Sequence, residues 1–550
     1  VKMVSRTLAE GIGLEGGYNR YCIFREHKSG LWYVKKSDDI ISDGMFVSLR
    51  GFEYQVYLDV QEVTDTKDGK YAKLNELLKN IEIIECHADL DTNINGISYD
   101  SRSTKEGDLF VAIVGFESDG HKYIPMAKEK GASVILCERA PECDIPYILV
   151  SDSRNALALG SCEFFGNPSK EMTVIGITGT NGKTTTTYLI KHMLEAKLNA
   201  KVGLVGTNGN MIGDEFIHTE RTTPESYELQ HLFREMKDAG CTHVVMEVSS
   251  HSLALSRVAG IDFDVGIFSN LTQDHLDFHN TMEEYAAAKA KLFSMCRVGC
   301  INFDDKWYET IIKDAACRIF GYSAKSNEAD LVAKDIRLSA SGVKFCAVAD
   351  DKIERVKLCI PGEFSVYNAL AVISAGLALG MSLSDCAEAM ADAKGVKGRM
   401  EVVPTNGNYT ILIDYAHTPD ALENALKALR TTAEGRLVVL FGCGGDRDRT
   451  KRPIMGGIAA DNADFVIVTS DNPRTEEPQS IIDEICVGLK GKNTPHKVIC
   501  DRIEAIHWAI DNHRENDVIL LAGKGHEDYQ VIGKEKFHMD EREIVADYIG

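Results

Sequence analysis

The sequence predicts a multidomain α/β protein with an all-β segment in front. The stretch TVIGITGTNGKTTTT at 173–187 places a β-branched strand before a glycine turn and the start of a helix. Apolar strands alternate with helical stretches through residues 399–550, which is typical of a parallel sheet covered by helices on both faces. The chain of 550 residues is also too long for one hydrophobic core and long enough for roughly three or four domains.

Residues 1–72 form the predicted β extension. Short β-branched and aromatic segments at 31–35, 45–49 and 54–60 are separated by Ser-Gly, Ser-Asp-Gly and charged turns. The sequence MFVSLRGFEYQVYLDVQEVTD resembles the terminal β-domain of amylase-type glycoside hydrolases. Such a domain is inert without its barrel, so we expect no catalysis from this extension.

The remaining chain divides into three predicted zones. Residues 73–170 have mixed α/β character, with strands at 108–113 and 133–137 around a helix at 123–130. Residues 171–398 form a second α/β zone that opens with the glycine turn. Residues 399–550 contain the alternating pattern, with predicted strands at 409–414, 437–441, 465–469, 497–500 and 518–522. Functional residues of such a sheet are expected at the carboxyl ends of its strands.

The composition restricts which binding partners and which cellular compartment we expect for this protein. The formal net charge of -22 argues against nucleic acid or an anionic membrane as a partner. The 15 cysteines are scattered without a C-x-x-C pair, which indicates reduced thiols. No apolar run approaches the roughly 20 residues that span a bilayer, and no secretory leader opens the chain. We expect a cytoplasmic monomer.

The glycine turn has the chemistry of a nucleotide phosphate cradle. Gly179 and Gly182 allow successive N–H groups to point inward, Lys183 can reach the terminal phosphates, and Thr184 or Thr185 can hold magnesium. The helix that begins near Lys183 directs its positive end at the same anion. We assign the cradle to Gly179, Thr180, Asn181, Gly182, Lys183, Thr184 and Thr185.

This loop departs from the standard G-x-x-x-x-G-K-[ST] pattern, because Ile177 stands where the first glycine is expected. An ordinary turn before a helix is therefore the alternative. The preceding strand, and apolar residues at helical spacing after the loop, favour the phosphate site.

Polar residues follow two further apolar strands. Glu247 ends the strand in HVVMEVSS and is placed to bind a phosphate-associated metal, with an acidic strand cap as the alternative. The strand in FDVGIFSN runs into Asp274, His275, Asp277 and His279, which are metal ligands or simply the start of a capped helix. Magnesium prefers oxygen, so a lone histidine here is more often structural.

The ordered motifs of this chain closely resemble those of the Mur ligase family. They are TGTNGKTTT, MEVSSHSL, SNLTQDHLDFH, YAAAKAKLF, GRME, IDYAHTPDAL, FGCGGDRDRTKRP, SDNPR and AGKGHEDYQ, and the resemblance as a whole covers about residues 74–550. The resemblance implies a three-domain architecture: a mixed α/β UDP-sugar domain, a central P-loop ATPase domain and a Rossmann-like domain that binds the incoming amino acid. It also implies ATP-dependent phosphorylation of the D-glutamate carboxylate of UDP-N-acetylmuramoyl-L-alanyl-D-glutamate, followed by amine attack on the acyl phosphate.

The resemblance assigns the catalytic and metal-binding roles. Glu247 and His275 match the family's metal positions. Lys289 matches a lysine that family members carry as a carbamate able to hold a second magnesium, whereas an ordinary surface lysine would repel the metal. Lys183 and magnesium would neutralise the approach of the substrate carboxylate to the γ-phosphate. The implied catalytic set is Lys183, Glu247, His275 and Lys289, and the metal set is Thr184, Glu247, His275 and carbamylated Lys289.

Other ligand contacts carry over by position. Adenine and ribose contacts match Asn368, Arg399 and Asp414. Uridine-side contacts match Tyr99, Ser101, Phe116, Glu117 and Ser118. Contacts to the muramoyl peptide match Arg221, Thr222, Thr223, Ser249 and Arg257. Leu255 stands where some relatives have glutamine, so that contact stays open.

The added amino acid is predicted to be meso-diaminopimelate. Arg474 follows a strand and a proline turn, and its planar fork suits a bidentate grip on a carboxylate that lysine lacks. The resemblance agrees, because relatives that add diaminopimelate show DNPR at this point. Glu527 suits an ammonium group. The matched pocket is Arg447, Asp471, Asn472, Pro473, Arg474, Gly523 and Glu527.

Several alternatives remain open on sequence alone. A structural salt bridge is the other interpretation of Arg474. A lysine-adding ligase is the nearest alternative enzyme, and a folylpolyglutamate synthetase is disfavoured by YDSR, DNPR and GKGHED. A non-catalytic nucleotide-binding or glycan-tethering module is disfavoured by the metal-binding and phosphate-binding residues.

Overall fold

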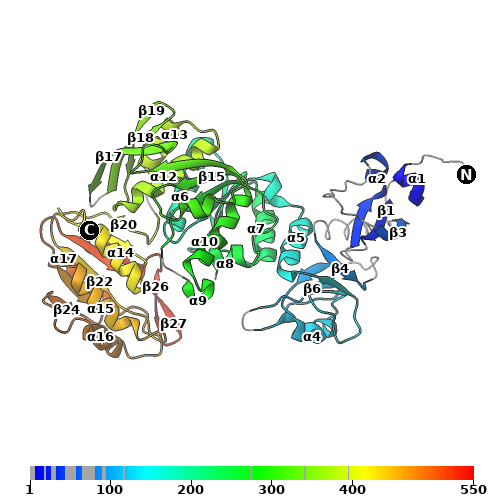
Figure 1. Cartoon of the computed structure of the whole chain (residues 1–550). Helices are drawn as coiled ribbons and strands as arrows, with labels where there is room; N and C mark the ends of the chain where they lie inside the picture. Colours follow the sequence, from blue (N-terminus) through cyan, green and yellow to red (C-terminus); the bar gives the residue numbers. More distant parts are fainter. Residues whose placement is uncertain are drawn as a thin grey trace, which may run out of the picture. The chain divides into compact units, whose positions relative to one another are not determined.

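The computed structural model describes residues 7–17, 20–26, 32–43, 57–64, 81–88, 94–115, 118–219, 221–272, 275–339, 342–393 and 396–550. Figure 1 labels the helices and strands of the chain. The chain divides into two compact units. Unit 1 comprises Val1–Thr173, Thr223–Thr242 and Val248–Asp262, and unit 2 comprises Val174–Thr222, His243–Glu247 and Phe263–Gly550. The domain boundaries expected at 72, 170 and 398 stay predictions.

The N-terminal segment holds a three-stranded antiparallel sheet in the order β2-β1-β3. Its strands are β1 (Arg20–Glu26), β2 (Trp32–Lys36) and β3 (Tyr57–Thr64). The prediction of an all-β segment is wrong, because the helices α1 (Leu8–Ile12) and α2 (Ser37–Asp43) are also present. The overlooked signal is a capping box, in which the side chains of Thr7 and Glu10 satisfy each other's backbone N–H groups. The strand predicted at 45–49 lies outside the described residues.

Unit 1 also contains a five-stranded sheet in the order β4-β8-β7-β6-β5, with β4 as an antiparallel edge. Its strands are β4 (Ile83–Cys86), β5 (Gly96–Ser98), β6 (Asp108–Val111), β7 (Val134–Cys137) and β8 (Tyr147–Val150). Every residue of β6 and β7 is buried, as expected for parallel strands covered on both faces. The helices of this unit are η1 (Gly120–Tyr123), α4 (Ile124–Glu129), α5 (Ser153–Phe164), η2 (Pro168–Glu171), α7 (Ser226–Asp238) and α8 (Ser250–Ala254).

The largest sheet of unit 2 has eleven strands, in the order β12-β11-β10-β13-β9-β14-β15-β16-β17-β18-β19. Their bounds are β9 Thr173–Thr178, β10 Val202–Val205, β11 Asn210–Ile212, β12 Glu215–Ile217, β13 His243–Glu247, β14 Phe263–Phe268, β15 Cys296–Asn302, β16 Arg318–Ser323, β17 Leu331–Ser339, β18 Gly342–Ala349 and β19 Lys352–Leu358. Four neighbouring strands in the middle of the sheet, β9, β14, β15 and β16, run parallel. Their carboxyl ends therefore share one edge of the sheet.

Helices cover this central sheet, and the helix that follows the glycine turn packs against a second, nearly fully buried helix. These two are α6 (Lys183–Leu198) and α12 (Phe364–Ala378). The others are α9 (Leu276–His279), α10 (Met282–Ala290), η3 (Lys291–Ser294), α11 (Tyr308–Ile312) and α13 (Leu383–Asp392).

The C-terminal sheet has six strands in the order β20-β21-β25-β22-β23-β24, all parallel except the edge strand β20. The strands are β20 (Glu401–Val403), β21 (Thr410–Asp414), β22 (Leu437–Phe441), β23 (Phe465–Val468), β24 (His496–Val498) and β25 (Val518–Ala522). A hairpin of β26 (Tyr529–Ile532) and β27 (Glu535–His538) follows β25. The five strands predicted from sequence are confirmed to within two residues at each end.

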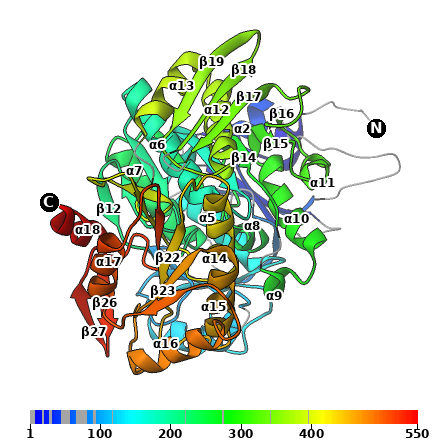
Figure 2. The same ribbon diagram turned by 90° about the vertical axis from the view of Figure 1, so that its left-hand side faces the viewer.

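Alternate residues of these strands point to opposite faces, as the two-residue period of a strand requires. Leu412, Val439 and Leu520 face one core, which contains α14 (Pro419–Arg430), α15 (Lys451–Asn462) and α16 (Pro478–Val487). Ile411, Leu440 and Leu521 face the other, which contains α17 (Arg502–Asp511) and α18 (Glu541–Ile549) (Figure 2). The predicted helix-covered parallel sheet is confirmed.

Across the described ranges, no helix combines the length and the apolar character needed to cross a membrane.

Candidate active site

The glycine turn between β9 and α6 has the backbone that a phosphate cradle needs. Gly179 and Gly182 have φ angles of 151° and 87°. A Cβ atom at Gly179 would lie 2.0 Å from the Ser269 hydroxyl, and one at Gly182 would lie 2.5 Å from Asn368 Oδ1. Both glycines are therefore required for close approach as well as for backbone freedom.

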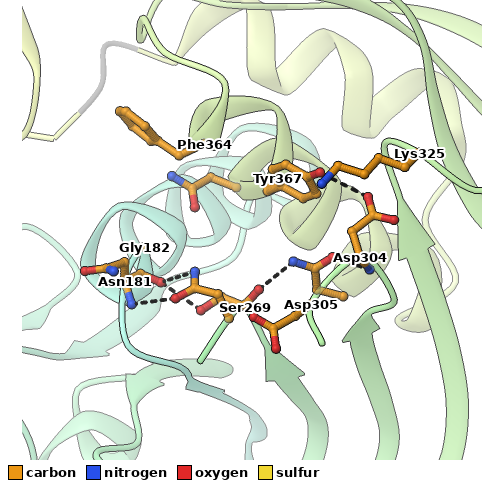
Figure 3. Close-up of a pocket in the computed structure, with 11 residues that line it drawn as sticks. Asn181, Gly182, Ser269, Asp304, Asp305, Lys325, Phe364 and Tyr367 are labelled. Carbon is orange, nitrogen blue, oxygen red and sulfur yellow. Dashed lines mark hydrogen bonds between the residues drawn. The ribbon is translucent and has the colours of Figure 1, made fainter. Parts of the chain in front are cut away.

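The segment that follows β14 holds this loop in place (Figure 3). Thr180 N donates to the Asn270 carbonyl at 2.9 Å, and Asn181 N donates to Asn270 Oδ1 at 2.9 Å. The Asn181 carbonyl accepts from Asn270 Nδ2 at 3.0 Å and from Ser269 Oγ at 2.7 Å. These bonds fix the loop, and the N-cap residue of α6 is Gly182, which makes no side-chain cap. The N-terminal amides of such a helix are suited to bind an anion.

Lys183 lies folded over the loop. Its Nζ donates to the carbonyls of Gly179 at 3.0 Å and Thr180 at 2.9 Å. An arriving phosphate offers this ammonium a charged acceptor in place of two neutral ones, which is the stronger interaction.

Glu247 joins two segments at the carboxyl edge of the central sheet. Its carboxylate is buried, with the residue 1% exposed. Oε1 accepts from the Thr184 hydroxyl and from Thr207 N, each at 2.9 Å, and Oε2 accepts from the Thr207 hydroxyl at 3.1 Å. Thr207 Oγ1 also lies 3.0 Å from the Thr222 hydroxyl. Glu247 therefore anchors a loop and also places a carboxylate beside the hydroxyl predicted to hold magnesium.

Lys289 is not an ordinary surface lysine. It is 1% exposed, its Nζ donates to the Gly179 carbonyl at 2.8 Å, and it lies 4.5 Å from the centroid of the Tyr285 ring. This position is beside the phosphate loop, where the resemblance requires a metal-holding group.

The histidines of the same region differ in exposure. His275 is exposed and has a φ of 53°, and its ring lies edge-on to Tyr285 at 6.2 Å. His279 is buried and its ring lies 5.1 Å from that of Tyr285, which supports a structural role. Asp274 and the side chain of Asp277 lie outside the described residues. Within the described part of the chain, no three acidic, His or Cys side chains group closely enough to form a metal cluster.

A cavity of about 250 Å³ opens beside Gly182 (Figure 3). Asn368 projects into it from α12, and its buried Nδ2 has no hydrogen-bond partner among the described residues. The phenol of Tyr367 donates to Asp304 Oδ2 at 3.1 Å. The lining residues are Asn181, Gly182, Ser269, Asn270, Asn302, Asp304, Asp305, Lys325, Phe364, Tyr367 and Asn368. An unpaired amide next to a phosphate loop is suited to the polar edge of a purine.

In the C-terminal domain, Arg399 and Asp414, two of the three residues predicted to contact the adenine and ribose, lie near one another. Asp414 Oδ2 accepts from Met400 N at 2.8 Å, and the Arg399 guanidinium lies 5.3 Å from the centroid of the Tyr415 ring. Burial raises the pKa of Asp414, and the charge of Arg399 opposes that rise. Arg399 Nε is buried without a partner in the part of the chain that is described.

Arg474 sits on a strained turn after β23, with a φ of 52°. Its backbone pairs with the hairpin, since Arg474 N donates to the Val531 carbonyl at 3.1 Å and Gly533 N donates to the Arg474 carbonyl at 2.7 Å. Its Nη1 donates to the Gly445 carbonyl at 2.9 Å. The guanidinium makes no ion pair within the described residues, so the structural salt bridge that sequence left open for Arg474 is absent there.

The other predicted amino-acid contacts cluster beside it. Asn472 Nδ2 donates to Glu527 Oε2 at 2.9 Å, and a Cβ at Gly523 would lie 2.7 Å from Asp471 Oδ2. Pro473, which lies between Asn472 and Arg474 in the chain, is buried. Arg447 is exposed on the GGDRD loop. These side chains come from the ends of β22, β23 and β25, as the parallel-sheet rule requires.

In unit 1, the contacts expected for the muramoyl peptide also group together. Arg257 pairs with Glu225 at 2.8 Å and donates to the Thr223 carbonyl at 3.2 Å. Ser249 N donates to the Thr223 hydroxyl at 3.3 Å. Leu255 ends the short helix α8.

The expected uridine-side residues are more dispersed. Tyr99 donates to Glu228 Oε1 at 2.8 Å, Ser101 Oγ lies 3.2 Å from Met126 Sδ, and Ser118 Oγ lies 2.9 Å from Tyr123 Oη. Phe116 and Glu117 lie outside the described residues. In unit 2, Arg221 is exposed and its N–H donates to the Thr219 hydroxyl.

Three family models match the chain. The Mur ligase middle domain matches residues 177–376, the "Mur ligase, glutamate ligase domain" matches 398–525, and the "Mur ligase family, catalytic domain" matches 93–161. A UDP-N-acetylmuramoyl-L-alanyl-D-glutamate--2,6-diaminopimelate ligase of Caldanaerobacter subterraneus is 48% identical over 87% of this chain and 99% of its own length. The chain belongs to the Mur ligase family.

Other similar proteins agree with this family. The Clostridium botulinum ligase of the same name is 48% identical over 86% of this chain and 99% of its own length. A solved structure of a UDP-N-acetylmuramoyl-L-alanyl-D-glutamate--2,6-diaminopimelate ligase is 33% identical, with a TM-score of 0.65 over 83% of this chain and 94% of that one. The chain is thus an ATP-dependent Mur ligase with the three-domain α/β architecture of its family.

Sequence reasoning missed several residues of this Mur ligase site. Asn270 and Tyr367 shape the cavity beside Gly182, and the SNLT segment after an apolar strand was the available signal. Lys524 lies at the centre of the predicted amino-acid pocket, inside the GKGHED motif. Arg452 is fully buried and donates to Glu476 and Glu484 behind the GGDRD loop. The residues that these side chains contact lie far away in the sequence, so the sequence alone did not indicate their roles.

Proposed function

We propose that this protein adds meso-2,6-diaminopimelate to UDP-N-acetylmuramoyl-L-alanyl-D-glutamate in an ATP-dependent step of peptidoglycan precursor synthesis. The observation that carries the proposal is the near-full-length identity of 48% to ligases with this name. Arg474 supports it, because an arginine without an ion pair in the described structure stands at the end of β23 among groups suited to a zwitterion.

The first step brings two anions together, so the chain must supply positive charge. Lys183 and the N-terminal amides of α6 bind the phosphates, and Asn368 binds the base in the adjoining cavity. Thr184 and Glu247 offer two neighbouring oxygens, the hard donors that Mg²⁺ prefers, and this pair fits the ion. Bound Mg²⁺ supplies the positive charge that offsets charge on the transferring phosphoryl group.

We also propose that Lys289 is carbamylated in the active protein and that His275 completes the metal-binding set. Burial of Lys289 next to the Gly179 carbonyl supports the carbamate, because the lysine is confined beside the phosphate loop. A carbamate would turn a group that repels a cation into an oxygen donor.

In the second step, the amino-acid pocket orients the nucleophile. Arg474 and Arg447 hold the distal carboxylate, and Asp471 and Glu527 receive the distal ammonium. The amine at the other end of the molecule is then presented to the acyl phosphate, which makes the attack effectively unimolecular.

An assay of ligation with different amino acids tests this function. Purified protein is supplied with ATP, Mg²⁺ and the UDP-linked dipeptide, and each reaction contains meso-diaminopimelate, L-lysine or L-glutamate. We expect phosphate release and a product of the correct mass only with meso-diaminopimelate. Equal turnover of L-lysine would contradict the assignment and favour a lysine-adding ligase.

We further propose that the protein works as a monomer in the cytoplasm. Burial raises the pKa of the Cys137, Cys162 and Cys443 thiols to about 12, which keeps them protonated and resistant to oxidation. Sedimentation analysis of the full chain tests the oligomeric state.

A further inference from the structure

Lys524 is a buried cation at the centre of the predicted amino-acid pocket. Its side chain is fully buried on the loop that follows β25. The Nζ atom lies 2.6 Å from Asn472 Oδ1 and 2.6 Å from the Tyr529 carbonyl. It also lies 3.4 Å from Glu527 Oε2 and 3.5 Å from Asp471 Oδ1. A buried ammonium is tolerated only when it is paired in this way.

The ammonium decides which way the Asn472 amide points. Asn472 Oδ1 accepts from Lys524 Nζ and from Val531 N, the latter at 2.9 Å. Two donors on one side require an oxygen there, so the NH₂ group must face Glu527 Oε2 at 2.9 Å. Without Lys524 one of these two constraints is lost.

The same ammonium also supports the strand behind Arg474. It holds the Tyr529 carbonyl at the start of β26. Two residues further along β26, the Val531 carbonyl accepts from Arg474 N at 3.1 Å. Lys524 thus fixes both the amide beside the predicted ammonium subsite and the strand that positions the arginine.

Charge balance gives the ammonium a third effect. Lys524 Nζ lies 3.5 Å from Asp471 Oδ1 and 3.4 Å from Glu527 Oε2, so its positive charge offsets the negative charges that these two carboxylates bring to the pocket. A zwitterionic ligand needs both an anionic and a cationic partner here.

We propose that Lys524 is a positioning residue for the amino-acid substrate, acting through Asn472, Glu527 and the β26 strand. This inference rests on the proposed function and deepens it. It assigns a specificity role to a residue that has no need to touch the ligand.

The test replaces the ammonium by a neutral chain of similar length, Lys524→Met, in the full-length protein. We expect KM for meso-diaminopimelate to rise by about tenfold or more, while KM for ATP and for the UDP-linked dipeptide stay within about twofold. Arg436→Met is the matched control, because Arg436 pairs with buried Asp517 near the start of β22 and β25, at the other end of the strands. This control should lower stability without changing KM for the amino acid.

A double-mutant cycle with Asn472→Ala separates positioning from general structure. If Lys524 acts through Asn472, the two changes together should raise KM by clearly less than the product of their separate effects. Should Lys524→Met fail to fold in thermal unfolding, Lys524→Gln takes its place in the cycle. Fully multiplicative effects, or an equal rise in KM for ATP, would overturn the proposal. If the wild-type protein ligates L-lysine and rejects meso-diaminopimelate, the proposed function is refuted. The effect of Lys524→Met would then be measured as the change in KM for L-lysine.

Discussion

Arg502 and Glu541 form a buried ion pair behind the amino-acid pocket. Arg502 Nε donates to Glu541 Oε1 at 2.8 Å, and the two side chains are 0% and 1% exposed. The guanidinium also donates to the Ala522 carbonyl at 2.9 Å and reaches the Ser470 carbonyl at 3.5 Å. These two carbonyls directly precede Gly523 and Asp471, so one buried cation joins the ends of two strands that carry predicted binding residues.

We predict that Arg502→Met destabilises the protein by roughly 3–5 kcal/mol, because it leaves the Glu541 carboxylate buried without its partner. Thermal and denaturant unfolding measure the loss. The double variant Arg502→Met with Glu541→Leu should recover most of the stability, since no buried charge then remains. A double variant as unstable as the single one would show that the carbonyl contacts, and not the charge, dominate.

The glycine of the phosphate loop gives a second prediction. Gly182→Ala should raise KM for ATP by about tenfold or more, because its Cβ would meet Asn368 Oδ1 at 2.5 Å and displace the loop or the amide. Steady-state kinetics at varied ATP checks this. Gly240→Ala is the matched control, since Gly240 also has a φ of 87° but nothing lies within 4 Å of its Cβ position. That variant should lose only the roughly 1 kcal/mol of backbone strain and keep its KM for ATP.

Local signals made much of this site predictable. Gly182 and Arg474 stand in short motifs whose chemistry can be understood without tertiary structure, and parallel strands place such motifs at one edge. Lys524 was not predictable, because its acceptors Asn472 and Asp471 lie about 50 residues earlier in the chain. Lys289 shows the same limit, since a helix sequence of alanines and lysines does not reveal that one lysine faces the Gly179 carbonyl.

The fold was more predictable than the contacts within it. Near-continuous apolar strands gave the C-terminal sheet to within two residues at each end, because burial on both faces leaves a strong composition signal. The N-terminal helices were missed because α1 spans only five residues, too few to show a period. Only its capping box marked it.

A third prediction concerns the choice of amino acid. Arg474→Lys keeps the charge but loses the planar fork, so KM for meso-diaminopimelate should rise by about 10- to 100-fold. Arg449→Lys is a suitable control, because Arg449 lies in the same domain and its side chain is 65% exposed beside Glu484. Competition between meso-diaminopimelate and L-lysine in one reaction measures selectivity directly. Unchanged selectivity in Arg474→Lys would remove the arginine from the recognition of the distal carboxylate.

The last prediction follows from the buried guanidinium of Arg452. Its side chain is fully buried and donates to both oxygens of Glu476, at 2.9 and 2.8 Å. These hydrogen bonds, with one from Asp446 N, lower the pKa of Glu476 from 4.5 to about 2. Glu476 Oε1 accepts from Asp446 N, and the Thr475 hydroxyl donates to Asp446 Oδ1. These two bonds join the loop that carries Arg447 to the loop that carries Arg474.

A carboxyl group whose pKa is lower in the folded state than in the unfolded state stabilises the folded protein at pH values above the pKa of the unfolded state. That stabilisation is lost as the pH falls toward the folded value. The difference in free energy of unfolding between wild type and Glu476→Gln should therefore be constant above about pH 5 and shrink between pH 4.5 and about 2. Denaturant unfolding across this pH range measures it. Glu477→Gln, at an exposed neighbour that makes no ion pair in the described structure, is the control for the loss of a nearby surface charge. Parallel curves for wild type and Glu476→Gln down to pH 2 would mean that Arg452 does not depress this pKa.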